Sequence, residues 1–167
     1  MSDISIIIPV LNEENNIARI LQYLKNHQYG FIKEIIVVDG GSTDNTIQIA
    51  AVNGADVISS GKGRAKQLNA GAKYASGKIL YFLHADSYPP KHYDKYITDN
   101  INGISGSGCF KMKFNSQHWL LRLSGWLTKF NNSWCRGGDQ SLFIYRDLFF
   151  KTGGFDESYI IYEDNEI

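Results

Sequence analysis

The stretch ISIIIPVLNEENNIARILQYLKN, residues 4–26, contains the two patterns from which the fold is predicted. It begins with ISIIIPVL, a continuous and largely β-branched run of the kind found in a strand that is buried on both faces. The run stops at Asn12. Further along, apolar residues follow the i, i+3, i+4, i+7 spacing of one helical stripe: Ile17, Ile20, Leu21 and Leu24. A buried strand followed by an amphipathic helix favours an α/β protein.

The same alternation of strands and helices continues to residue 86. Strands are predicted at 34–39 (EIIVVD), 55–60 (ADVISS) and 78–86 (KILYFLHAD). One helix is predicted within 40–54, with Ser42, Thr43 or Asp44 as its cap and Gly54 as its stop, and a second within 63–77. Strands separated by helices at this spacing need crossover connections, so we expect a mainly parallel sheet flanked by helices.

The second half is less regular. A helix is predicted at 91–101, a strand at 105–114 and a helix at 119–130. One stripe of the last helix is apolar and holds Trp119, Leu123, Trp126, Leu127 and Phe130. We expect the Trp119–Phe130 stripe to pack on its own domain or on a partner subunit in a homo-oligomer. Peripheral contact with a membrane is the alternative, because tryptophans beside basic residues are an interfacial pattern.

Composition limits the class of protein. A chain of 167 residues with 43% hydrophobic residues is most simply one domain, residues 1–167. With 17 basic and 17 acidic residues its formal net charge is zero, which argues against a nucleic-acid partner.

The two cysteines, Cys109 and Cys135, are expected to be buried free thiols. The start MSDISIIIPV lacks the pattern of a secretory signal, and no run approaches the roughly 20 apolar residues of a membrane span, so a cytoplasmic protein is expected. The abrupt end at YEDNEI suggests that a C-terminal segment is missing.

Polar residues follow three of the predicted strands. They are Asn12-Glu13-Glu14 after the first, Asp39 after the second and Asp86 at the end of the fourth. The carboxyl ends of parallel strands form the edge where ligands bind in open α/β sheets, so these residues are candidates for one site. Asp39 ends a buried run and needs hydrogen-bond partners, which a nucleobase or ribose can supply. The loop GKGRAKQLN adds Lys62, Arg64 and Lys66, which can meet a diphosphate, although a basic surface loop is the commoner reading.

The segment YFLHADSYPP, residues 81–90, contains a candidate metal site. In an extended strand, side chains at i and i+2 share a face, so His84 and Asp86 are predicted to project together. An imidazole nitrogen and a carboxylate oxygen form a partial site for a divalent metal that also binds phosphate oxygens. A lone histidine at a strand end is more often structural.

Far along the chain, Glu163-Asp164 is a pair of acids that can include a general base, although such pairs usually lie on a solvated face.

The order of these segments along the chain indicates the class of protein more specifically than any single segment does. The following series resembles the family 2 glycosyltransferases, which are inverting nucleotide-sugar enzymes with the Rossmann-like GT-A fold: IIIPVLNEE, IIVVDGGSTDNT, GRAKQLNAGAKYASG, ILYFLHADSYPP, GGDQSLF and GGFDESYIIYEDNE. The resemblance covers nearly the whole chain in the family's order. HAD in place of the usual Asp-x-Asp motif, together with GGDQSLF, is similar to a small soluble bacterial branch of the family.

The resemblance implies a role for individual positions on the donor side. Pro9, Leu11 and Glu13 match the first-strand loop that lies against the nucleoside, and Asp39 matches the acid that reads the base. Arg64 and Asn69 match the segment beside base and diphosphate. Ala85, within the HAD motif, is counted with these donor-binding residues.

The resemblance also implies the metal, base and acceptor positions. Asp86 matches the last acid of the Asp-x-Asp motif, which meets a manganese or magnesium ion bound to the donor diphosphate, and His84 replaces the first acid. Asp164 matches the general base, with Glu163 as its neighbour. Asp139 and Gln140 fall where the family lines the acceptor side.

These roles imply transfer of a sugar from a nucleoside-diphosphate sugar, most often a UDP-sugar, to an acceptor hydroxyl with inversion. Two other classes stay open. One is a non-catalytic or truncated nucleotide-sugar binding remnant, which the HAD substitution and the early stop favour. The other is a sugar nucleotidyltransferase, which is disfavoured because PVLNEE is acidic where that class carries a glycine-rich basic signature.

Overall fold

The computed structural model describes residues 3–101, 106–110 and 141–158. Six strands are present in these ranges: β1 (Ile4–Val10), β2 (Ile32–Asp39), β3 (Asp56–Ser59), β4 (Ile79–Phe82), β5 (Ser107–Cys109) and β6 (Leu142–Tyr145). The helices of the same ranges are α1 (Ile17–His27), α2 (Thr46–Val52), α3 (Arg64–Tyr74), α4 (Tyr93–Ile101) and α6 (Arg146–Lys151).

The six described strands form one sheet in the order β3-β2-β1-β4-β6-β5. Strands β3, β2, β1 and β4 pair in parallel, whereas β6 is antiparallel to both β4 and β5. The predicted mainly parallel sheet is therefore confirmed. Since each parallel pair needs a crossover, a helix follows each of β1, β2 and β3.

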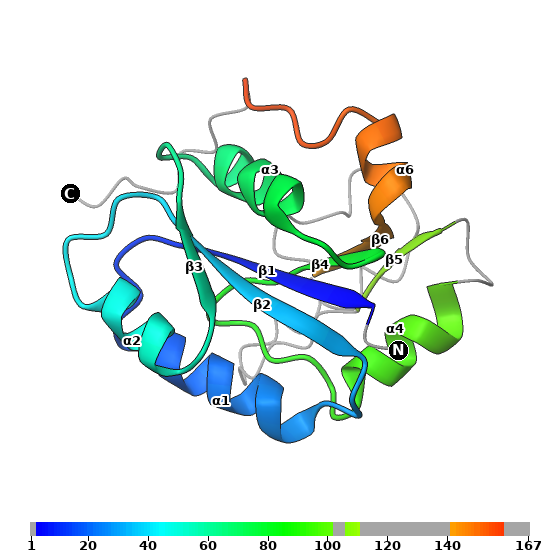
Figure 1. The fold of residues 1–167 in the computed structure, drawn as a ribbon, viewed down its shortest axis with the longest axis horizontal. Helices are drawn as coiled ribbons and strands as arrows, with labels where there is room; N and C mark the ends of the chain where they lie inside the picture. The colour runs from blue at the N-terminus through cyan, green and yellow to red at the C-terminus, as the bar shows by residue number, and fades with distance from the viewer. Residues whose placement is uncertain (1–2, 102–105, 111–140, 159–167) are drawn as a thin grey trace, which may run out of the picture.

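Helices cover both faces of the sheet, with α1, α2 and α4 on one side and α3 and α6 on the other (Figure 1). Side chains of β1 alternate between the two layers because successive residues of a strand point to opposite faces. Ile6 and Ile8 pack toward α1, and Ile7 packs toward α3. The predicted stripe of α1 is confirmed, since all four of its apolar residues are fully buried.

Two predictions differ from the structure, and two elements were not predicted. The strand predicted at 78–86 ends at Phe82, and residues 84–87 form a turn closed by a hydrogen bond from the Ser87 amide to the His84 carbonyl (3.1 Å). Cys109 is exposed at the outer strand β5, so its predicted burial is wrong. Strand β6 and helix α6 were not predicted, because an apolar run as short as LFIY gives no periodicity to interpret.

Within the described ranges, no helix combines the length and hydropathy that crossing a bilayer requires. The predicted surface stripe Trp119–Phe130 and Cys135 lie outside the described residues.

Candidate functional site

The carboxyl ends of β1, β2 and β3 lie level with one another. Val10 pairs with Asp39, and Asp39 pairs with Ser59, so the last residues of three neighbouring strands stand side by side. Strand β4 ends at Phe82, opposite Ile7 of β1. The chain then continues alongside β1, and the Leu83 amide donates to the Ile7 carbonyl (3.0 Å). The loops that follow these four strands therefore meet at one edge of the sheet. This edge is the one predicted from the polar residues that follow the strands in the sequence.

Asp39 is buried at this edge with 3% of its surface exposed. Its carboxylate accepts hydrogen bonds from the Gly41 amide (2.9 Å) and the Ser42 amide (3.1 and 3.2 Å). Gly41 has a φ of 104°, which a side chain would strain, and this conformation turns the two amides back onto the carboxylate. The partners of Asp39 are therefore supplied by its own loop, and a ligand is not needed to satisfy it. Its contact with a nucleobase stays a prediction.

Gln67 is a residue of this edge that the sequence interpretation missed. Its side-chain amide is buried and donates to the carbonyl oxygens of Val10 and Val38, both at 2.8 Å. One side-chain amide on α3 thereby connects the carboxyl ends of β1 and β2. It lies so close to Gly40 that a Cβ built on Gly40 would stand 3.0 Å from it. The signal was available, because Gln67 lies on the same helical stripe as the buried Leu68, Gly71 and Ala72.

The loops after β1 and β2 are joined by hydrogen bonds between side chains and backbone amides. The amides of Asn12, Glu13 and Glu14 donate to Ser42 Oγ (2.9 Å), Thr46 Oγ1 (2.8 Å) and Asp44 Oδ2 (3.1 Å), in that order. In return, Asn12 Oδ1 accepts from the Thr43 amide (2.8 Å) and Glu14 Oε2 from the Asn45 amide (3.1 Å). Ser42 and Thr43 thus bond to the other loop instead of capping α2.

The cap prediction is wrong in its residue, because the N-cap of α2 is Asn45 and makes no side-chain cap hydrogen bond. Asp44 lies one residue before it, and its Oδ1 accepts from the Thr46 amide (3.0 Å). Desolvation raises the pKa of Asp44, but hydrogen bonds from Thr46 and Glu14 outweigh it, so the pKa lies below its ordinary value. The carboxylate is therefore held ionised where it can accept both bonds.

The predicted basic loop leads from β3 into α3 at the same edge. The Ser60 amide donates to the Asp39 carbonyl (2.9 Å), and α3 begins at Arg64 after Gly63, whose φ is 130°. Arg64 is half-buried, and Lys62 and Lys66 are exposed. The first turn of α3 starts close to the loop after β2, since Gln67 stands against Gly40. Backbone amides at a helix start and an arginine are groups that suit an anion.

The HAD segment lies in the turn after β4. His84 is half-buried, Ala85 is buried and Asp86 is exposed, with Ser87 Oγ donating to Asp86 Oδ1 (3.2 Å). His84 and Asp86 do not share a strand face as predicted, because β4 ends at Phe82, before both of them. In the described ranges, no three His, Cys, Asp or Glu side chains gather as a metal cluster.

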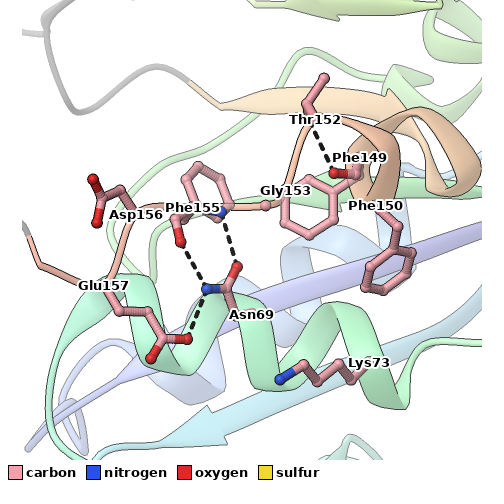
Figure 2. A pocket seen from close by; sticks show the side chains of 10 residues that line it. Asn69, Lys73, Phe149, Phe150, Thr152, Gly153, Phe155, Asp156 and Glu157 are labelled. Atoms are coloured by element: carbon pink, nitrogen blue, oxygen red, sulfur yellow. Dashed lines mark hydrogen bonds between the residues drawn. The ribbon is translucent and has the colours of Figure 1, made fainter.

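Asn69 bonds to the segment after α6, whose Phe155 ring lies against Phe82 at the end of β4 (ring centroids 5.0 Å apart). Its Nδ2 donates to the Phe155 carbonyl (2.9 Å) and to Glu157 Oε1 (2.8 Å), and its Oδ1 accepts from the Phe155 amide (3.0 Å) (Figure 2). The side chain therefore fastens the segment after α6 onto α3, beside a cavity of about 520 Å³ that Lys73 and Phe150 also line. Its predicted contact with the donor is untested.

The other predicted site residues lie outside the described ranges. They are the acids Glu163 and Asp164 and the acceptor-side residues Asp139 and Gln140. The structure brings Pro9, Leu11, Glu13, Asp39, Arg64 and the HAD turn to one edge and leaves the position of these four open.

The fold and this edge define an α/β domain whose polar loops meet where ligands bind in parallel sheets. The profile of glycosyl transferase family 2 matches residues 5–143, so the chain belongs to that family. The match includes the loops after β1, β2, β3 and β4.

Individual relatives match parts of the chain. Glycosyltransferase AglE of Haloferax volcanii is 34% identical over 113 residues, which cover 63% of this chain and 36% of that protein. Glucosyl-3-phosphoglycerate synthase of Mycobacterium tuberculosis is 35% identical over 98 residues, 52% of this chain and 30% of that one. The chain thus spans about a third of the length of these relatives.

A crystal structure of the M. tuberculosis synthase, in complex with Mn²⁺, UDP-glucose and phosphoglyceric acid, has a similar fold. The TM-score is 0.66 at 22% identity, covering 89% of this chain and 58% of that one. The predicted GT-A fold is thereby confirmed.

Proposed function

We propose that this chain is the donor-binding and catalytic domain of an inverting glycosyltransferase that moves a sugar from a nucleoside-diphosphate sugar, a UDP-sugar in the first instance, to an acceptor hydroxyl. The observation that carries the proposal is the meeting of the loops after β1, β2, β3 and β4 at one sheet edge in a family 2 chain. Structures with the same fold hold UDP and Mn²⁺, which supports a nucleotide donor and a divalent metal.

The donor would lie across this edge. Leu11 and Glu13 would contact the nucleoside together with Pro9, and Asp39 would read the base with a carboxylate that its own loop already holds in place. Arg64 and the first turn of α3 would meet the diphosphate, because a guanidinium and free helical amides are good donors to phosphate oxygens.

The HAD turn fits a metal that the substrate helps to hold. Asp86, with His84 beside it, would provide one or two ligands, and the donor diphosphate would provide others, as is usual for manganese and magnesium in phosphate sites. Bound there, the metal would offset negative charge on the leaving diphosphate.

Asp164 would act as the general base, removing the proton of the acceptor hydroxyl, with Glu163 beside it. The acceptor oxygen would attack the anomeric carbon as the nucleoside diphosphate departs from the opposite face, so the configuration inverts. Asp139 and Gln140 would line the acceptor side. The acceptor is a molecule with a nucleophilic hydroxyl, and its identity needs separate screening.

Calorimetric titration with UDP and with GDP, each with and without manganese, tests the donor site. We expect manganese-dependent binding of UDP, and an Asp39→Ala variant that binds about tenfold or more weakly, because each 1.4 kcal/mol of lost contact costs a factor of ten. An Asp56→Ala variant is the control, since that exposed acid lies at the start of β3, far from the edge. Absence of nucleotide binding by the unmodified chain under every condition would overturn the proposal.

Release of UDP from a UDP-sugar in the presence of candidate acceptors tests the base. Asp164→Asn is expected to reduce turnover by at least a hundredfold with donor affinity unchanged, since a positioned general base typically contributes a factor of about 10²–10⁴. Equal losses in turnover and affinity would argue against Asp164 as base. Retained binding with no turnover in a longer natural chain would favour the non-catalytic alternative, which the histidine at position 84 supports.

A further inference from the structure

We infer that Asn12 is a positioning residue for the nucleotide site, because it joins the loops after β1 and β2 into one wall before the ligand arrives. The inference rests on the proposed function, in which this wall receives the nucleoside. Asn12 itself is assigned no contact with the substrate. Its effect would pass through Ser42 to Asp39.

The junction at Asn12 is reciprocal. Its backbone amide donates to Ser42 Oγ (2.9 Å), while its side-chain Oδ1 accepts from the Thr43 amide (2.8 Å) and the Thr43 hydroxyl (3.3 Å). Each loop thus both donates to and accepts from the other. Such paired bonds fix the distance and the orientation of the two loops at once, which a single bond does not.

The backbone of Asn12 adopts a conformation that most side chains avoid. Its φ is 56°, and only one other described non-glycine residue, His92, has a positive φ. Asparagine tolerates this left-handed region better than most residues, and such conformations cluster at functional sites. Here the conformation lets both the amide and the side chain of Asn12 reach the same loop.

Ser42 connects this junction to the buried carboxylate. Its Oγ accepts from Asn12, and its own amide donates to Asp39 at 3.1 and 3.2 Å. A shift of Ser42 would therefore move one of the two amides that orient Asp39. Pre-organisation of this kind improves affinity, since the loops do not have to be ordered when the ligand binds.

The fold does not depend on Asn12 alone. Further from the edge, the Glu13 amide donates to Thr46 Oγ1 (2.8 Å) and the Glu14 amide donates to Asp44 Oδ2 (3.1 Å). These bonds remain when the Asn12 side chain is removed. Loss of that side chain should consequently loosen the wall locally without unfolding the domain.

The variant Asn12→Gly tests the inference, because glycine keeps the positive φ and removes only the side-chain acceptor. We expect the dissociation constant of UDP with manganese to rise about tenfold, while the melting temperature without nucleotide changes little. Ser42→Ala, which removes the acceptor of the Asn12 amide, should weaken UDP binding in the same direction. Asn53→Gly is the matched control, since its Nδ2 bonds to the Ile49 carbonyl (2.9 Å) at the far end of α2.

The outcomes separate the inference from the proposed function. UDP binding by the unmodified chain, with equal affinity in Asn12→Gly and Ser42→Ala, would overturn the inference and leave the proposed function standing. Equal weakening in Asn12→Gly and Asn53→Gly would also overturn it, because the cause would then be general destabilisation. No UDP binding by the unmodified chain would count against the proposed function itself.

Discussion

At the scale of single residues, several carboxylates act as acceptors that tie distant segments of backbone together. Asp94 on α4 is fully buried and accepts the amides of Tyr29, Gly30 and Phe31 at 2.8 to 2.9 Å, which holds the loop before β2. Glu34 on β2 does the same for the turn before β4, where its Oε1 accepts the Ser76 amide (2.8 Å) and hydroxyl (3.0 Å). These residues support the sheet from the end opposite to the candidate site.

Glu34 leads to a prediction about pH. Partial burial raises the pKa of Glu34, but hydrogen bonds from Ser5 and Ser76 outweigh it, so the pKa in the folded state lies below the ordinary 4.5. A carboxylate with a lowered pKa contributes stability that is fully present above its unfolded pKa and is lost as the pH falls through the folded one. Replacing it with glutamine removes this titration.

We therefore expect Glu34→Gln to be less stable than the unmodified protein by a constant amount above about pH 5.5, a unit above the ordinary glutamate value. Below pH 4.5 the difference should shrink. Urea unfolding of both proteins between pH 3 and pH 7 measures it. A difference that does not change over this range would contradict the role given to the Glu34 carboxylate.

At the scale of elements, the close approach of α3 to the sheet positions the edge residues that α3 carries. Gly71 lies over β1 and β2, and a Cβ built there would stand 2.4 Å from Ile7 Cγ2 and 3.0 Å from Val38 Cγ2. The helix can lie this close only because residue 71 has no side chain. The same approach brings Gln67 within reach of the Val10 and Val38 carbonyls.

Gly71→Ala is predicted to destabilise the domain by about 1–3 kcal/mol, the usual cost of overpacking a well-packed core. In an unrestrained helix the same change would stabilise by about 1 kcal/mol, so the sign of the effect is informative. Thermal or urea unfolding measures it. Gly61→Ala is the control, since its nearest neighbour is Lys66 Cδ at 3.7 Å and its φ is ordinary. A neutral or stabilising Gly71→Ala would show that α3 can move away from the sheet.

At the scale of the whole molecule, the elements as far as α4 and β5 were predictable from local pattern, whereas β6 and α6 were not. Strands β1 and β2 are long apolar runs, and α1 has a clear stripe, so local pattern identified them. Strand β6 comes late in the chain and yet pairs with β4, between β4 and β5. Its position depends on hydrogen bonds to segments far away in sequence, and the spacing of apolar residues within β6 gives no information about them.

The candidate site shows the same division. The sequence by itself determined that polar residues follow the strands, and hence that Glu13, Asp39 and Asp86 are candidates for one site at the carboxyl edge, because the crossover pattern makes these strands parallel. Only the tertiary structure decided what each side chain bonds to. Ser42 bonds to Asn12 instead of capping α2, Asp39 is satisfied by its own loop, and Asn69 holds Phe155. The physical reason is that burial and periodicity are properties of neighbouring residues, whereas a hydrogen bond needs two groups within about 3 Å, often from segments that only folding brings together.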